Sequence, residues 1–120
     1  MTKRLGDFAV KFGTSGARGL VEDLTPAYCA CFTLAFLALF ETPPPQLLIG
    51  RDLRPSSEAI AEACAAAARH VGVDVVNAGE VPTPALAHAA KMRGAPAIMV
   101  TGSHIPDDRN GLKAYRSEGE

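Results

Sequence analysis

One serine of this chain has neighbours that suit a nucleophile. Ser103 follows shortly after the apolar run 97–100 and stands between Gly102 and His104, and Pro106 restricts the turn that comes next. If the apolar run is a buried strand, a serine just beyond its end lies at the surface of the sheet. Its hydroxyl is then exposed at the edge of the sheet where ligands bind, which makes it a candidate nucleophile.

A second segment has the composition of a phosphate-binding loop. Glycine recurs at every third position from 13 to 19, with Gly16 at the centre and Thr14, Ser15 and Arg18 between the glycines. Glycine lets backbone amides approach an anion, and an arginine donates two parallel hydrogen bonds to it. The segment lacks the Gly-Lys-Ser/Thr of a P-loop and the helix start of a dinucleotide fingerprint. Its spacing alone fits a plain flexible loop equally well.

Two other interpretations of the polar segments are weaker. A hydrolase elbow around Ser103 needs glycine at positions 101 and 105, where this chain has Thr101 and Ile105. The charged run 51–54 could bind an anion, but its alternating Arg and Asp side chains favour an internal salt-bridge network that holds a loop.

The elements that must position these segments alternate along the chain. Strand-like and helix-like patterns predict an α/β domain of three layers, with a mostly parallel (mixed) sheet of four to five strands and helices on both faces. The expected strands are 8–12, 46–49, 73–76, 97–100 and 111–115, and the expected helices are 26–41, 57–71 and 83–93. Ligands bind beyond the carboxyl ends of parallel strands, and all the polar segments fall at that edge.

Composition excludes several classes of protein. The 120 residues carry a net charge of −1, too neutral for binding nucleic acid by phosphate neutralisation. No secretory signal is visible, and the apolar run 27–40 is shorter than the roughly 18 residues of a membrane span. We therefore expect a cytoplasmic domain without nucleic-acid or membrane partners. Because helix 26–41 is apolar all round, we hypothesise that part of it meets another domain or subunit.

The ordered motifs resemble a known family, the α-D-phosphohexomutases. The motifs are FGTSGARG (12–19), GRDLRPSS (50–57), VPTP (81–84) and TGSHIPDDRNGLK (101–113). The resemblance covers nearly the whole chain and implies the first of about four domains, with residues 1–120 as a single domain and the remaining domains absent. The last motif resembles the phosphoserine loop of the family, with Gly102 and Ile105 where the commoner form has Ala and Asn.

The resemblance also implies residue roles. Ser103 would carry the phosphoryl group beside His104, Lys113 would reach that group and act in proton transfer, and Arg18 would point into the cleft. Residues expected to bind phosphate or substrate are Thr14, Ser15, Gly16, Gly102 and Asn110. Arg51 and Asp52 match a motif that we regard as mostly structural.

The implied activity is that of a phosphomannomutase/phosphoglucomutase. Phosphoserine 103 would exchange its phosphoryl group with mannose or glucose 1- and 6-phosphates through a bound bisphosphate intermediate. Mg²⁺ would bind Ser103 through its phosphate, with its other ligands outside this chain. The 120 residues alone are expected to be inactive as a mutase. The alternatives are a non-catalytic phosphosugar-binding or assembly module, and the corresponding domain of a phosphoglucosamine mutase.

Overall fold

A computed structural model describes residues 11–13, 16–102 and 106–117. The helices are α1 (Pro26–Leu37), α2 (Ser57–His70) and α3 (Thr83–Arg93), with a short 3₁₀ helix, η2 (Val21–Asp23). The strands are β1 (Lys11–Gly13), β2 (Gly16–Leu20), β3 (Gln46–Arg51), β4 (Asp74–Glu80), β5 (Ala97–Val100) and β6 (Arg109–Tyr115).

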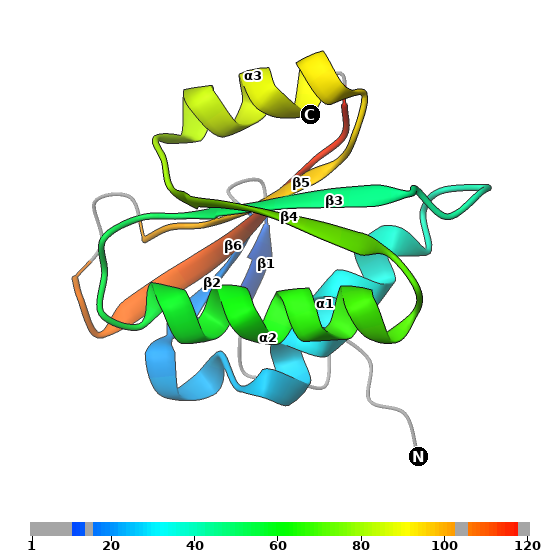
Figure 1. The fold of residues 1–120 in the computed structure, drawn as a ribbon. Coiled ribbons are helices and arrows are strands. Elements are labelled where there is room, and N and C mark those ends of the chain that lie inside the picture. Colours follow the sequence, from blue (N-terminus) through cyan, green and yellow to red (C-terminus); the bar gives the residue numbers. More distant parts are fainter. Residues whose placement is uncertain (1–10, 14–15, 103–105, 118–120) are drawn as a thin grey trace.

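The described strands form one mixed sheet in the order β1-β2-β6-β5-β3-β4. Strand β3 pairs parallel with both β4 and β5, whereas β1, β2, β6 and β5 pair antiparallel in succession. Helix α3 covers one face, and α1 and α2 cover the other, which gives three layers (Figure 1). The expected α/β class, mixed sheet and two-sided helical cover are confirmed, and parallel pairing is confined to the three strands β4, β3 and β5.

The core explains why the central strands are apolar without alternation. Along β5, Ile98 and Val100 pack into the cluster under α1 and α2, whereas Ala97 and Met99 pack into the cluster under α3. Successive side chains of a strand point to opposite faces, so a strand with helices on both sides must be apolar at every position. This run of four residues is the strand that the sequence predicts with correct bounds at both ends.

Helix α1 begins where its cap residue predicts. Thr25 has extended backbone and its Oγ1 accepts a hydrogen bond of 3.1 Å from the Tyr28 amide, with Pro26 as the first helical residue. The helix ends at Leu37, earlier than expected. Its outer face leaves Leu34 exposed, and Leu39 beyond its end is 64% exposed. Contact of this face with another domain or subunit stays a prediction. In the described part of the chain, no helix has the length and apolarity needed to cross a membrane.

The Gly-rich segment 13–19 differs from its expected form. Residues Gly16–Leu20 are strand β2, where we expected a loop, and they pair antiparallel with both β1 and β6. Gly16 has a φ of +84°, and a Cβ there would overlap the carbonyl oxygen of Leu112. Glycine is therefore needed because β6 approaches the backbone closely, a reason for glycine in a strand that composition does not reveal.

We predict that the Thr25 cap stabilises the domain measurably. Replacing Thr25 by Ala removes the acceptor for the Tyr28 amide, and we expect the free energy of unfolding to fall by about 1 kcal/mol. Urea unfolding followed by circular dichroism measures this change. Thr25→Ser keeps the acceptor and serves as the control, so equal losses in the two variants would show that the hydroxyl contributes nothing.

Candidate active site

Sheet register brings Arg18 next to the segment that leads to Ser103. Arg18 of β2 lies opposite Gly111 of β6. The Gly111 carbonyl accepts a hydrogen bond of 3.0 Å from the amide of Thr101, the residue after β5. A Cβ at Gly111 would lie 3.2 Å from Cγ of Arg18 and 3.1 Å from the Thr101 carbonyl oxygen. Residues 18, 111 and 101 thus form one row across three neighbouring strands, two positions before the serine.

Lys113 lies on the same face of the sheet as Arg18. The intervening side chains of the two strands, Ala17 and Leu112, pack into the core under α1 and α2, so Arg18 and Lys113 point to the opposite face. Gly16 lies on the same face as these two cations, because a Cβ at this position would lie 3.0 Å from Cγ of Lys113. Helix α3 packs on β3 and β5, and it leaves both cations half-exposed. The arrangement places two positive side chains where an anion can reach them.

The loop after β3 forms a hydrogen-bonded clamp on the segment that carries Ser103. Asp52 Oδ1 accepts hydrogen bonds from the Arg54 amide at 3.1 Å and from the Ser57 hydroxyl at 2.5 Å. Asp52 Oδ2 accepts from Arg54 Nε at 3.2 Å and from the Gly102 amide at 3.1 Å. Ser57 is the first residue of α2, where the helix dipole favours an anion. The carboxylate therefore joins β3, α2 and the residue just before Ser103.

Arg54 contacts the other flank of the same segment. Its Nη1 donates to the Pro106 carbonyl at 2.9 Å, to the Asp107 carboxylate at 3.2 Å and, at a longer 3.4 Å, to the Arg109 carbonyl. The Arg54 side chain is only 11% exposed. The network interpretation of Asp52 and Arg54 is confirmed. Arg51 instead pairs with Glu80 at 3.5 Å.

Asn110 is hydrogen-bonded to the start of α2 and does not lie on the face of the sheet that carries Arg18 and Lys113. It is fully buried, and its Nδ2 donates to the hydroxyls of Ser56 and Ser57, each at 2.9 Å. Its Oδ1 accepts from the Gly111 amide at 2.8 Å. This differs from the expectation that Asn110 binds phosphate or substrate, because its polar atoms are occupied within the protein. Ser56, expected to cap α2, makes no side-chain cap bond and instead accepts from Asn110.

Gly102 also differs from its expected role. Its amide, which we expected to bind phosphate, already donates to Asp52. The other predicted site residues lie outside the described residues: Thr14, Ser15, Ser103 and His104. Among the residues that the structure describes, the sheet therefore brings together Gly16, Arg18 and Lys113. They lie on the face opposite α1 and α2, which we call the open face because α3 covers only part of it. The sequence pattern did not indicate that Asn110 and Ser57 join the clamp. The two residues are hydrogen-bonded to each other across more than fifty positions, and no local motif reveals such a contact.

The hydrogen bonds around Asp52 also determine its acidity. Burial by itself would raise the pKa of this carboxyl group, but the donors have the larger combined effect and hold the pKa below its usual value of 3.8. Those donors are the hydroxyls of Ser57 and Thr101 and the amides of Gly102 and Arg54. Asp52 is therefore ionised at neutral pH and stabilises the folded clamp in that form.

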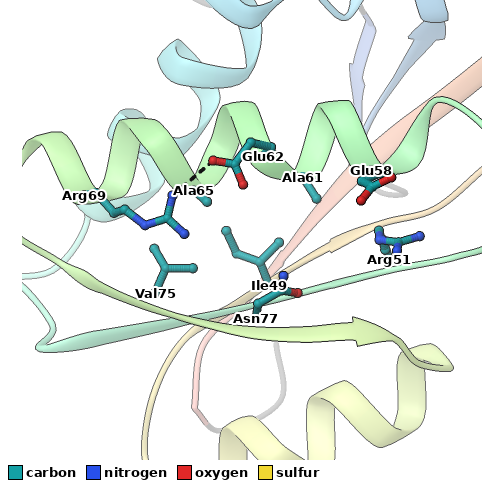
Figure 2. A pocket seen from close by; sticks show the side chains of 9 residues that line it. All are labelled: Ile49, Arg51, Glu58, Ala61, Glu62, Ala65, Arg69, Val75 and Asn77. Carbon is teal, nitrogen blue, oxygen red and sulfur yellow. Dashed lines mark hydrogen bonds and ion pairs between the residues drawn. The ribbon is translucent and has the colours of Figure 1, made fainter.

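A separate hollow lies between α2 and the strands β3 and β4 (Figure 2). Its volume is about 80 Å³, well below the roughly 300 Å³ at which pockets for small molecules begin. Its arginines pair within the protein, because Arg69 contacts Glu62 at 3.1 Å and Arg51 contacts Glu80. This hollow lies on the face of α2, opposite the face with Arg18 and Lys113, and it does not belong to the candidate site.

The described residues do not by themselves provide a metal centre. Within 16–102 and 106–117, no three His, Cys, Asp or Glu side chains are placed to hold an ion together. Asp107 is 83% exposed and pairs with Arg54.

Comparison with known proteins agrees with this arrangement. The family model described as phosphoglucomutase/phosphomannomutase, alpha/beta/alpha domain I, matches residues 9–120. A phosphomannomutase of Salmonella muenchen is 55% identical over 92% of this chain, and one of Sinorhizobium fredii is 45% identical over 92%. A phosphoglucosamine mutase of Kineococcus radiotolerans is 40% identical over 90%. The chain spans about a quarter of the length of these relatives, namely 24%, 24% and 25%.

A solved structure has the same fold. The crystal structure of a phosphoglucomutase/phosphomannomutase family protein from Burkholderia thailandensis superimposes with a TM-score of 0.72 at 33% identity. The match covers 82% of this chain and 24% of that one.

We predict that Asp52 makes the stability of the domain depend on pH in the acid range. Because its folded pKa is lowered, its contribution is fully present above the ordinary pKa and disappears as the pH falls through the folded value. Asp52→Asn should cost about 2 kcal/mol of unfolding free energy at pH 7 and much less once the pH lies below the folded pKa of Asp52. Urea unfolding across this range measures the difference. Asp74→Asn, at an exposed position, is the control, and a constant gap between wild type and Asp52→Asn would contradict the prediction.

Proposed function

This chain belongs to the phosphoglucomutase/phosphomannomutase family as its α/β/α domain I, and on that basis we propose that Ser103 carries the phosphoryl group of a phosphohexomutase. The complete enzyme would interconvert hexose 1- and 6-phosphates. The observation that supports this function best is the row of Arg18, Gly111 and Thr101, which places a cation beside the strand end that leads to Ser103.

The charges of the open face suit phosphoryl transfer. A phosphoryl group in transit spreads negative charge over its oxygens, and catalysis depends on positioning and on cations that neutralise that charge. Arg18 can donate two hydrogen bonds to such a group, and Lys113 on the next strand adds a compact positive charge. Both lie on the same face of adjacent strands, and the Lys113 side chain passes close to Gly16.

The proposed reaction follows from these positions. A hydroxyl oxygen of the bound sugar phosphate attacks phosphorus, and the bond between phosphorus and Ser103 Oγ breaks. The proton of that sugar hydroxyl is transferred to Ser103 Oγ, and Lys113 acts in this proton transfer. The product is a hexose 1,6-bisphosphate. It reverses its orientation in the cleft and then transfers its other phosphoryl group to Ser103. His104 adjoins the reacting serine in sequence, and Thr14 and Ser15 would contact phosphate. Mg²⁺ would assist, with ligands other than the phosphoserine supplied from outside this chain.

The substrate class follows from the relatives. Mannose and glucose phosphates are the proposed substrates, because the two most similar relatives reported above are phosphomannomutases. The phosphoglucosamine mutase of Kineococcus radiotolerans keeps an amino sugar phosphate as the alternative. The remaining domains of the enzyme, corresponding to about three quarters of the relatives' length, are the proposed partners that complete the cleft.

We predict that the complete enzyme that contains these 120 residues takes up one phosphoryl group at Ser103. Incubation with α-D-glucose 1,6-bisphosphate should add the mass of one phosphoryl group, and tandem mass spectrometry should locate it at Ser103. Arg18→Lys keeps the charge but loses the two-pronged donor, so we expect the rate of uptake to fall about tenfold or more.

Two matched variants decide the outcome of this experiment. Ser103→Ala should abolish uptake, whereas Ser117→Ala, which removes a hydroxyl from the far end of the described chain, should leave it intact. Phosphoryl groups found at another residue, or uptake that survives in Ser103→Ala, would rule out the assignment. A standard mutase assay on the same 120 residues should show no turnover, because we propose that the cleft needs the further domains.

A further inference from the structure

The guanidinium of Arg54 bridges the two flanks of the Ser103 segment. On one side Arg54 Nε donates to Asp52 Oδ2, which also accepts a hydrogen bond from the Gly102 amide. On the other side Arg54 Nη1 donates directly to the Pro106 carbonyl. Both flanks are described residues, and they enclose positions 103–105. Arg54 is more than fifty positions from Pro106 in sequence, so its side chain ties the end of β3 to both ends of a loop that follows β5.

Gly102 makes room for this bridge. A Cβ at position 102 would overlap Nε and Cζ of Arg54, so the guanidinium lies directly against the Cα of Gly102. The guanidinium is held there at several points, by Asp52 on one side and by Pro106 and Asp107 on the other.

We propose that Arg54 is a positioning residue for the reaction at Ser103. This inference rests on the proposed function, because it concerns the loop that carries the phosphoryl group. A lysine cannot replace Arg54, since its single ammonium group cannot serve an acceptor on each side as a planar guanidinium does. Phosphoryl transfer is sensitive to small displacements of the reacting atoms, so loosening either flank should slow it.

Amide hydrogen exchange on the ¹⁵N-labelled 120-residue chain tests the bridge directly. The informative amides are that of residue 102, which donates to Asp52, and that of Arg109, which donates to Pro106. In Arg54→Lys we expect both to exchange about tenfold faster, while Ile98 in the centre of the sheet, which reports overall unfolding, changes little. Unchanged rates at 102 and 109, or an equal acceleration at Ile98, would overturn the proposal.

Arg69→Lys is the matched control, because Arg69 forms an exposed ion pair with Glu62 away from the loop (Figure 2).

The rate at which the complete enzyme takes up a phosphoryl group from α-D-glucose 1,6-bisphosphate links the bridge to the reaction. Arg54→Lys should slow uptake at least tenfold and Arg69→Lys should not, whereas equal rates in Arg54→Lys and wild type would overturn the positioning role. If wild type takes up no phosphoryl group, the proposed function fails, yet the exchange data still decide whether Arg54 holds the two flanks. The two failures are therefore distinguishable.

Discussion

The need to satisfy a partly buried carboxylate organises the functional edge of this domain. Asp52 is only 24% exposed, and its two oxygens accept hydrogen bonds from α2, from its own loop and from the residue after Thr101. A carboxylate removed from water must be compensated by such donors, and each donor is thereby held in place. The same contacts that lower the pKa of Asp52 connect β3, α2 and the loop after β5.

The two faces of the sheet have different roles, one in the packing of the core and the other in the candidate site. On the face of α1 and α2, Asn110 and Leu112 are buried and hold β6 against the helices. On the opposite face, Lys113 and Arg18 remain half-exposed because α3 lies over β3 and β5. Since side chains alternate along a strand, one stretch of β6 contributes to the core and to the candidate site at once.

Several features could be predicted from sequence because their causes are local. The N-cap of α1 depends on Thr25 and Pro26, and the C-terminal stop of α3 depends on Gly94, which adopts a φ of +62°. Strand β5 is apolar at each of its positions and bounded by Pro96 and Thr101. Strand β2 was missed because its glycines resemble a loop, and Gly16 is required by the close approach of β6, which is more than ninety residues away.

For the candidate site, the residue types can be read from the chain alone: a serine after a buried strand, glycines beside Arg18, and a charged run that ends in Arg54. Their order also sufficed to indicate the family, because motifs are read along the chain. Which of these residues share a face became known from the fold. It placed Arg18 with Lys113 and turned Asn110 inward, because strand register and hydrogen-bond partners depend on contacts between distant residues.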